Sequence, residues 1–179
     1  MSATLSLTEA QTLSALRTVL LAAIGSGTEV IRAEINRVGE PPGGDYVELT
    51  PILRSRISTN HDSYTDGFFA TPHVPGIAQA LQATQVTVQL DIHGPNSADN
   101  VQIVSTIFRD PYTCDAFTAT GFDIQPLYTS EPRQSPFLNA EQQYEFRWTV
   151  DVVLQANPIV TTAQDFAVAA TVGIFSTPM

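Results

Sequence analysis

The sequence predicts an α+β fold, in which a mainly antiparallel sheet carries two or more packed helices. Residues 85–93 and 143–156 alternate apolar and polar side chains with a period of two, as half-buried strands do. Segments after Ser6 and after Ser97 place apolar residues three and four positions apart, as amphipathic helices do. Apolar residues make up 43% of the 179, which is enough for the core of a single domain spanning 1–179.

The first helix is expected to follow residues 6–9, which fit a capping box. In this motif the Ser6 hydroxyl and the Glu9 carboxylate each accept a hydrogen bond from the other residue's backbone N–H. The glycines at 25 and 27 are expected to end the helix, because glycine is the usual residue there. One apolar stripe along this helix is formed by Leu13, Leu16, Leu20 and Ile24.

The next segments are less regular. Residues 28–38 are compatible with a short strand or with more helix, and residues 39–44 form a loop rich in glycine and proline. Residues 46–58 read as a strand, but Pro51 cannot donate a hydrogen bond to a neighbouring strand. This strand is therefore expected to be an edge strand, to be bulged, or to be divided in two.

A long polar connection then separates two good strands, at residues 59–84. Loops of more than about 12–15 residues are uncommon in compact domains and are usually functional or disordered. We expect a protruding loop or arm at about residues 60–83. Its apolar residues either fold back on the domain or insert into a partner, and they are candidate subunit contacts. They are Tyr64, Phe68, Phe69 and Val74.

The strand at 85–93 is expected to bury Val86, Val88, Leu90 and Ile92 and to leave its polar face to solvent. A turn at 93–96 precedes a helix that Ser97 would cap. The sequence Asp110-Pro111 would stop that helix. Residues 122–139 contain spaced prolines and are expected to be irregular.

The second long strand would extend from 143 to 156. At about 3.4 Å per residue it would run roughly 40 Å or more, so it must bend or leave its own domain. Residues 157–158 would end it, and residues 166–175 would add an edge strand. The face expected to enter the core carries Tyr144, Phe146, Trp148, Val150, Val152 and Leu154.

The charge balance argues against tight binding of nucleic acid. The chain has 18 acidic residues, 8 arginines and no lysine, for a net charge of −10. Binding to phosphates needs clustered basic residues, and the nearest approach to such a cluster is the pair Arg54 and Arg56. With Arg133, these arginines are also taken as candidate subunit contacts.

No catalytic, cofactor-binding or metal-binding residues are predicted, and the chain is not expected to be an enzyme. His61, His73 and the pair Asp91 and His93 lack the spacing of zinc ligands. There is no G-x-S-x-G motif, although a catalytic triad can also assemble in space. Cys114 is the single cysteine, which excludes an internal disulfide, and it is expected to be a buried thiol.

Several long runs resemble the phage neck terminator, or tail terminator, proteins of contractile-tailed phages. The resemblance covers roughly residues 29–161 and includes the short runs Asn36-Arg37-Val38, Leu49-Thr50-Pro51 and RISTN at 56–60. Its longest runs are QVTVQLDIHGPNSADN, FRDPYTCD and PLYTSEPRQSPFLNAEQQYEFRWTVDVVLQANPIV.

This resemblance implies a tail-terminator-like fold without enzymatic activity or a cofactor. It implies a homo-oligomeric ring, expected to be a hexamer, that caps the tail tube and joins it to the head connector. Contact with the sheath protein is a further possibility, and genomic DNA would pass through without tight binding. The alternatives are another virion part, such as a tail-tube or head-completion protein, and a small hydrolase with a spatially assembled site.

The expected location follows from the same resemblance and from the first residues. The protein would lie in the neck of the virion, without membrane contact. The first sixteen residues carry no positive charge, so they do not form the basic region of a signal peptide. Assembly is therefore expected in the host cytoplasm.

Overall fold

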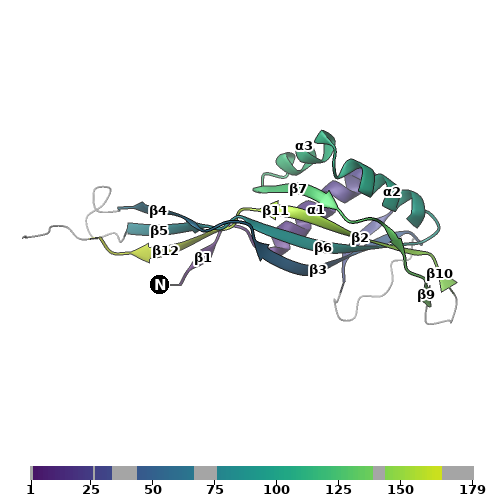
Figure 1. Ribbon diagram of the computed structural model, residues 1–179, viewed down its shortest axis with the longest axis horizontal. Helices are drawn as coiled ribbons and strands as arrows, with labels where there is room; N and C mark the ends of the chain where they lie inside the picture. Colours follow the sequence, from purple (N-terminus) through teal and green to yellow (C-terminus); the bar gives the residue numbers. More distant parts are fainter. Residues whose placement is uncertain (1, 26, 34–43, 67–75, 139–143, 167–179) are drawn as a thin grey trace, which may run out of the picture.

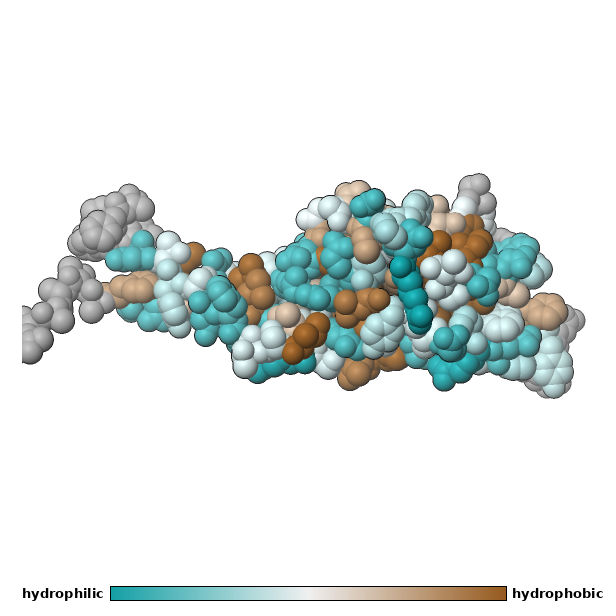
Figure 2. Space-filling model, turned by 45° about the horizontal axis from the view of Figure 1, so that its top comes forward, coloured by the Kyte–Doolittle hydropathy of each residue, from teal (hydrophilic) through white to brown (hydrophobic). Residues whose placement is uncertain are grey.

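The structure, a computed structural model, describes residues 2–25, 27–33, 44–66, 76–138 and 144–166. A sheet covered by helices on one face forms a body, and a narrower group of strands, here called the arm, extends from one end of it (Figure 1). The arm consists of strands β1, β4, β5 and β12. In Figure 2 the arm is largely hydrophilic, and brown hydrophobic side chains lie near its junction with the body.

The body sheet has the strand order β2-β3-β6-β11-β7, with β8 also paired to β11, and the arm sheet has the order β1-β12-β5-β4. All pairs are antiparallel except β2 with β3. This arrangement confirms the predicted α+β fold. The elements are β1 (Thr4–Leu5), α1 (Glu9–Ile24), β2 (Glu29–Arg32), β3 (Tyr46–Arg56), β4 (His61–Thr65), β5 (Gly76–Leu81), β6 (Thr84–His93), α2 (Ser97–Ile107), α3 (Pro111–Ala119), β7 (Ile124–Thr129), β8 (Arg133–Gln134), β9 (Phe137–Leu138), β10 (Tyr144–Glu145), β11 (Arg147–Ala156) and β12 (Ile159–Gln164).

The hydrophobic core lies between the body sheet and the helices. On β6 the predicted apolar face is buried, as the period of two requires, and the predicted stripe of α1 packs against it. The polar face of β6 is different from the prediction, because Asp91 and His93 are also buried. Side chains on β3 and β11, the strands that pair with β6 on its two sides, cover Asp91 and His93. The core residues of β6 are Val86, Val88, Leu90 and Ile92.

Helix α1 begins two residues later than predicted. Its N-cap is Thr8, whose hydroxyl accepts from the Gln11 N–H at 3.3 Å, while the Gln11 side chain accepts from the Thr8 N–H at 2.8 Å. The motif is a capping box, but Ser6 has a different role. The Ser6 hydroxyl accepts from the Ile159 N–H at 2.8 Å and so joins the start of the chain to β12.

Helix α2 follows β6 as predicted, but its N-cap is Asn96, and Ser97 is its first helical residue. The turn before it requires glycine at position 94. Gly94 has φ +101°, and a Cβ there would lie 2.2 Å from the carbonyl oxygen of Gly44. A side chain at this position would therefore collide with backbone as well as strain the turn.

Helix α3 was not predicted from the sequence. The sequence Asp110-Pro111 stops α2 and also starts α3, because the Asp110 side chain accepts from the Tyr112 N–H at 2.9 Å and proline fits the first helical turn. Cys114 lies on the exposed side of α3, so the prediction of a buried thiol is wrong. A proline after aspartate can thus mark two helix ends at once.

Strand β3 tolerates Pro51 in two ways. The pairing of β3 with β6 shifts between Pro51 and Leu53, which is a bulge. Strand β2 pairs only with the first part of β3, up to Leu49, so among the described strands Pro51 lies where β3 has become an edge. The structure therefore combines two of the predicted solutions.

The long strand predicted at 143–156 is interrupted. Strand β11 begins at Arg147, and the Phe146 carbonyl leaves the strand to accept from the Gly94 N–H at 3.1 Å. Trp148 packs against the core and is partly buried. Tyr144 and Phe146 are 81% and 63% exposed, so their assignment to the core face is wrong.

Alanine substitutions should separate these three aromatic residues. Trp148→Ala is expected to lower the free energy of unfolding by about 2 kcal/mol, below the roughly 3–5 kcal/mol of a fully buried aromatic residue. Tyr144→Ala and Phe146→Ala should change it by about 0.5 kcal/mol or less, because both side chains are exposed. Urea unfolding measures the difference. Equal losses for all three variants would contradict the exposed placement.

Several segments have more strand than predicted. Residues 61–65 and 76–81 are strands of the arm, where a loop was expected. Strand β7 lies at the edge of the body sheet, in the segment expected to be irregular, and β12 follows the predicted end of the long strand. Of the edge strand predicted at 166–175, only Phe166 lies within the described residues.

Candidate interaction surfaces

The predicted contact residues do not form one site. Tyr64 lies on β4 of the arm and is 63% exposed. Arg54 and Arg56 lie on the exposed second half of β3, and Arg133 lies on β8, on another part of the body. Phe68, Phe69 and Val74 lie outside the described residues. The structure therefore divides the described candidates between the arm and two parts of the body.

The arm is held together by strand pairing, because none of its described strand residues belongs to the hydrophobic core. All five residues of β4 are exposed, and β4 pairs only with β5 among the described strands. A shallow hollow of about 80 Å³ lies on the arm surface. Its lining combines polar side chains with small apolar ones, namely Asp62, Tyr64, Ala78, Gln79, Ala80, Val160 and Thr162.

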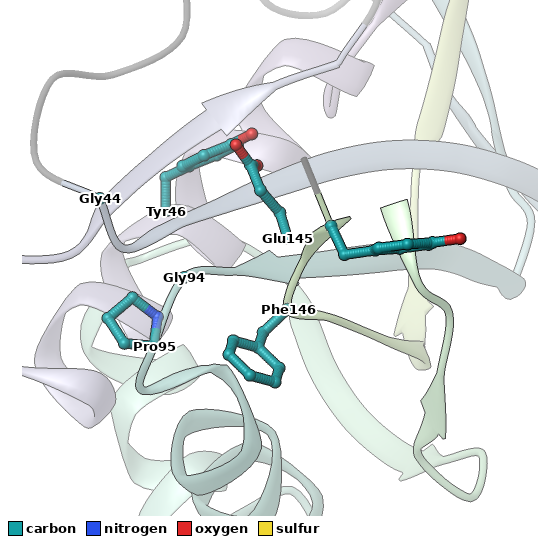
Figure 3. A pocket seen from close by; sticks show the side chains of 7 residues that line it. Gly44, Tyr46, Gly94, Pro95, Glu145 and Phe146 are labelled. Carbon is teal, nitrogen blue, oxygen red and sulfur yellow. The ribbon is translucent and has the colours of Figure 1, made fainter. Parts of the chain in front are cut away.

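A larger pocket, of about 290 Å³, lies at the end of the body opposite to the arm, near β10 (Figures 1 and 3). Figure 3 shows Glu145 reaching alongside the Tyr46 ring, and the Phe146 ring pointing toward Pro95. The pocket thus offers aromatic surface and one carboxylate to a partner. Its lining residues are Gly44, Tyr46, Gly94, Pro95, Tyr144, Glu145 and Phe146.

Beside this pocket, a hydrogen-bonded cluster lies on the face of the body sheet that none of the described helices covers (Figure 1). The Asp91 carboxylate accepts from Thr149 at 2.7 Å, from Gln89 at 2.8 Å and from Arg147, whose Nη2 lies 2.8 Å away. Burial alone raises the pKa of Asp91, but the hydrogen bonds from Thr149, Gln89 and Arg147, with the charge of Arg147, outweigh it and lower the pKa. The cluster therefore holds a buried carboxylate in its ionised form.

His93 lies between this cluster and the pocket. Its ring stacks on that of Tyr46, with the centroids 4.4 Å apart and the planes at 4°, and its Nε2 is 3.9 Å from the Glu48 carboxylate. Burial lowers the pKa of His93, the charge of Arg147 lowers it further, and the carboxylates of Asp91 and Glu145 partly oppose this. The imidazole is therefore held neutral to lower pH than in an unfolded chain.

The lowered pKa of His93 predicts a pH-dependent stability. As pH falls below about 6.5, the unfolded chain takes up a proton that folded His93 resists, so the free energy of unfolding should decrease. Denaturant unfolding between pH 7.5 and pH 5 measures this slope. The variant His93→Gln should have a shallower slope, and His61→Gln, which alters an exposed histidine on β4, serves as the control. Equal slopes for wild type and His93→Gln would contradict the prediction.

The pocket was not predicted from the sequence, because Tyr144 and Phe146 continue the alternating pattern of the strand and were expected in the core. Their exposure depends on where β6 ends beside β11, which only the pairing of these distant strands shows. The alternating pattern of β6 ends at His93, which pairs with Arg147. Strand β6 therefore offers no pairing partner to the residues before 147. Tyr144 and Phe146 lie beyond this last pair and are exposed.

Within the described ranges, no group of three His, Cys, Asp or Glu residues could hold a metal ion. None of the described helices is long and apolar enough to cross a membrane. What the described surface offers is contact area: an exposed arm, an aromatic pocket at the opposite end and charged edges between them.

Comparison with known proteins follows the same direction. A family model described as phage neck terminator protein matches residues 10–177. The match includes all of α1 except its first residue, as well as α2, α3 and the body sheet. No curated protein matches the chain.

Proposed function

Because the chain belongs to the phage neck terminator protein family, whose members are structural parts of the virion, we propose that it forms a ring that caps the tail tube and joins it to the head connector. The resemblance in the sequence implies six subunits. The ring would assemble in the host cytoplasm and then remain in the virion neck. Its role is structural, and neither a cofactor nor catalysis is part of the proposal.

One observation carries this proposal: the two ends of the molecule offer different contact surfaces. The arm extends from one end, with every residue of β4 exposed. The aromatic pocket with Tyr144 and Phe146 lies at the other end. A protein that joins two different structures needs two separate surfaces, and aromatic side chains are common at the centres of such contacts. The tail tube and the connector would each meet one end.

The charge of the chain fits a ring through which DNA passes. A net charge of −10 without any lysine leaves little basic surface to hold phosphates. In the proposed ring, genomic DNA would therefore move through without tight binding. For the ring to close, the negative charges of the subunits must be spread over the ring or screened by salt.

The arm provides the test. Strands β4 and β5 pair His61 with Leu81, so replacing Asp62–Gln79 by a short Gly-Ser turn closes the hairpin at its base. The body should stay folded and melt within about 2–4 °C of wild type, because none of the described arm residues belongs to the core. Ring formation or attachment to tails should fail. Native mass spectrometry and negative-stain images of tail ends measure these outcomes.

Ser63→Ala, which keeps the hairpin and changes one exposed side chain of β4, is the matched control and should assemble as wild type does. Two results would contradict the role of the arm. One is a shortened chain that unfolds, and the other is a shortened chain that forms rings and joins tails normally.

A further inference from the structure

One edge of the body sheet exposes two arginines with apolar side chains around them. Among the described strands, β2 pairs with β3 only as far as Leu49, so the second half of β3 is an edge of the described sheet. Residues 52–57, here called the β3 edge, include the exposed apolar side chains of Ile52, Leu53 and Ile57. Leu53 is 56% exposed, so this edge leaves a considerable apolar area in solvent. Exposed apolar area with charges at its rim is typical of a contact surface.

The two arginines of the β3 edge have polar contacts within the chain, but both side chains remain exposed. The Arg54 guanidinium lies 3.8 Å from the Glu9 carboxylate, which is also bonded by Arg32. With the Gln82 amide in its favourable orientation, Arg56 donates two hydrogen bonds to the amide oxygen, at 2.9 and 2.8 Å, but it forms no ion pair in the part of the chain that the structure describes. Both side chains are exposed, and their charges are available to a partner.

The opposite side of the body carries acidic residues. Strand β7 is the other edge of the body sheet, helix α3 packs on it, and both lie away from β3 in Figure 1. We call this side the α3–β7 edge. Its exposed apolar residues are Tyr112, Leu127 and Tyr128. Its exposed acids, none of which forms an ion pair with a described residue, are Asp110, Asp115, Asp123 and Glu131.

Two arginines also lie on this side, and both are engaged. Arg109 donates to the Thr129 carbonyl at 3.3 Å, and Arg133 lies 3.6 Å from the Asp151 carboxylate. The four exposed acids outnumber these two arginines, so the α3–β7 edge has an excess of negative charge. Like the β3 edge, it combines exposed apolar side chains with charged ones. The charge of the two edges is opposite in sign.

Neither edge is suited to pairing by strand addition. The β3 edge follows Pro51 and a bulge, and β7 contains Pro126 next to a second register shift, opposite Leu154. Proline and bulges at edge strands prevent another strand from continuing the sheet. A contact between these edges would thus be made by side chains.

We propose that neighbouring subunits meet head to tail, with the β3 edge of one copy against the α3–β7 edge of the next. This inference rests on the proposed ring and specifies its subunit contact. Two different, complementary surfaces of one chain form a heterologous interface, which is the kind that closes into rings. A contact of the β3 edge with itself would place arginines against arginines, which electrostatic complementarity disfavours.

Charge reversal tests the pairing directly. The double variant Arg54→Glu with Arg56→Glu makes both edges acidic, and Asp115→Arg with Glu131→Arg makes both edges basic. Each double variant alone should need at least a tenfold higher concentration than wild type to form rings in analytical ultracentrifugation. An equimolar mixture of the two variants should form rings again. Each acidic edge of the first variant can then meet a basic edge of the second, in an alternating ring. Native mass spectrometry should find both chains in each ring.

Two controls keep the test decisive. Asp99→Arg reverses an exposed charge on α2 and should leave assembly unchanged. If a reversed variant melts early, Arg54→Gln with Arg56→Gln replaces it and should still weaken assembly. Rings that form normally from each reversed variant alone, or a mixture that stays unassembled, would overturn the edge pairing and leave the ring proposal intact. A wild-type chain that stays monomeric at every concentration would overturn both.

Discussion

Replacing Phe117 with alanine is expected to lower the free energy of unfolding by about 3–5 kcal/mol, the loss typical of a buried phenylalanine. Phe117 is fully buried between α3 and the rest of the core. Its ring meets that of Phe108 edge to face, with the centroids 6.2 Å apart and the planes at 79°. The substitution would leave a cavity where α3 joins the body, because the backbone of a packed helix can collapse only in part.

Tyr112→Ala is the matched control, because it removes an aromatic ring from the exposed side of the same helix. It should change the free energy of unfolding by about 0.5 kcal/mol or less. A double-mutant cycle with Phe108→Ala should show coupling of about 0.5–1.5 kcal/mol, since the two rings are in contact. A loss below about 1 kcal/mol for Phe117→Ala would mean that α3 does not pack as described.

Replacing Asp91 with alanine is expected to cost about 3 kcal/mol of stability. The change would leave Thr149 and Gln89 without their acceptor and Arg147 without its carboxylate, on a part of the sheet where water has little access. The variant Asp91→Asn keeps the size of the side chain but loses the charge beside Arg147, so it should fall between alanine and wild type.

The pH dependence of this loss follows from the lowered pKa of Asp91. Its contribution to stability is complete above the unfolded pKa of about 4 and is lost as pH falls through the folded value. The difference between wild type and Asp91→Ala should therefore narrow in strong acid. Asp62→Ala, which removes an exposed carboxylate of β4, is the control and should be nearly neutral. A difference that is unchanged from pH 7 to pH 2 would argue against the ionised cluster.

The local sequence pattern was sufficient to predict the buried face of the elements that keep one period along their whole length. The alternation in β6 and the stripe of α1 predicted which side chains enter the core, and both predictions are confirmed. The spacing of apolar residues indicates the face of the element on which each side chain lies, and a layered fold buries one face of each element. The lack of lysine and the long runs shared with the neck terminator family were also visible in the sequence.

Positions that depend on a distant strand were decided only by the tertiary structure. Tyr144 and Phe146 continue the pattern of β11, yet they are exposed because β6 ends at its pairing with Arg147. Residues 76–81 are a strand because β12, some eighty residues later, pairs with them. Asp91 and His93 have the polar pattern of a solvent face, yet neighbouring strands bury them. Burial and pairing arise from segments far apart in the chain, and no local period records which segments will meet.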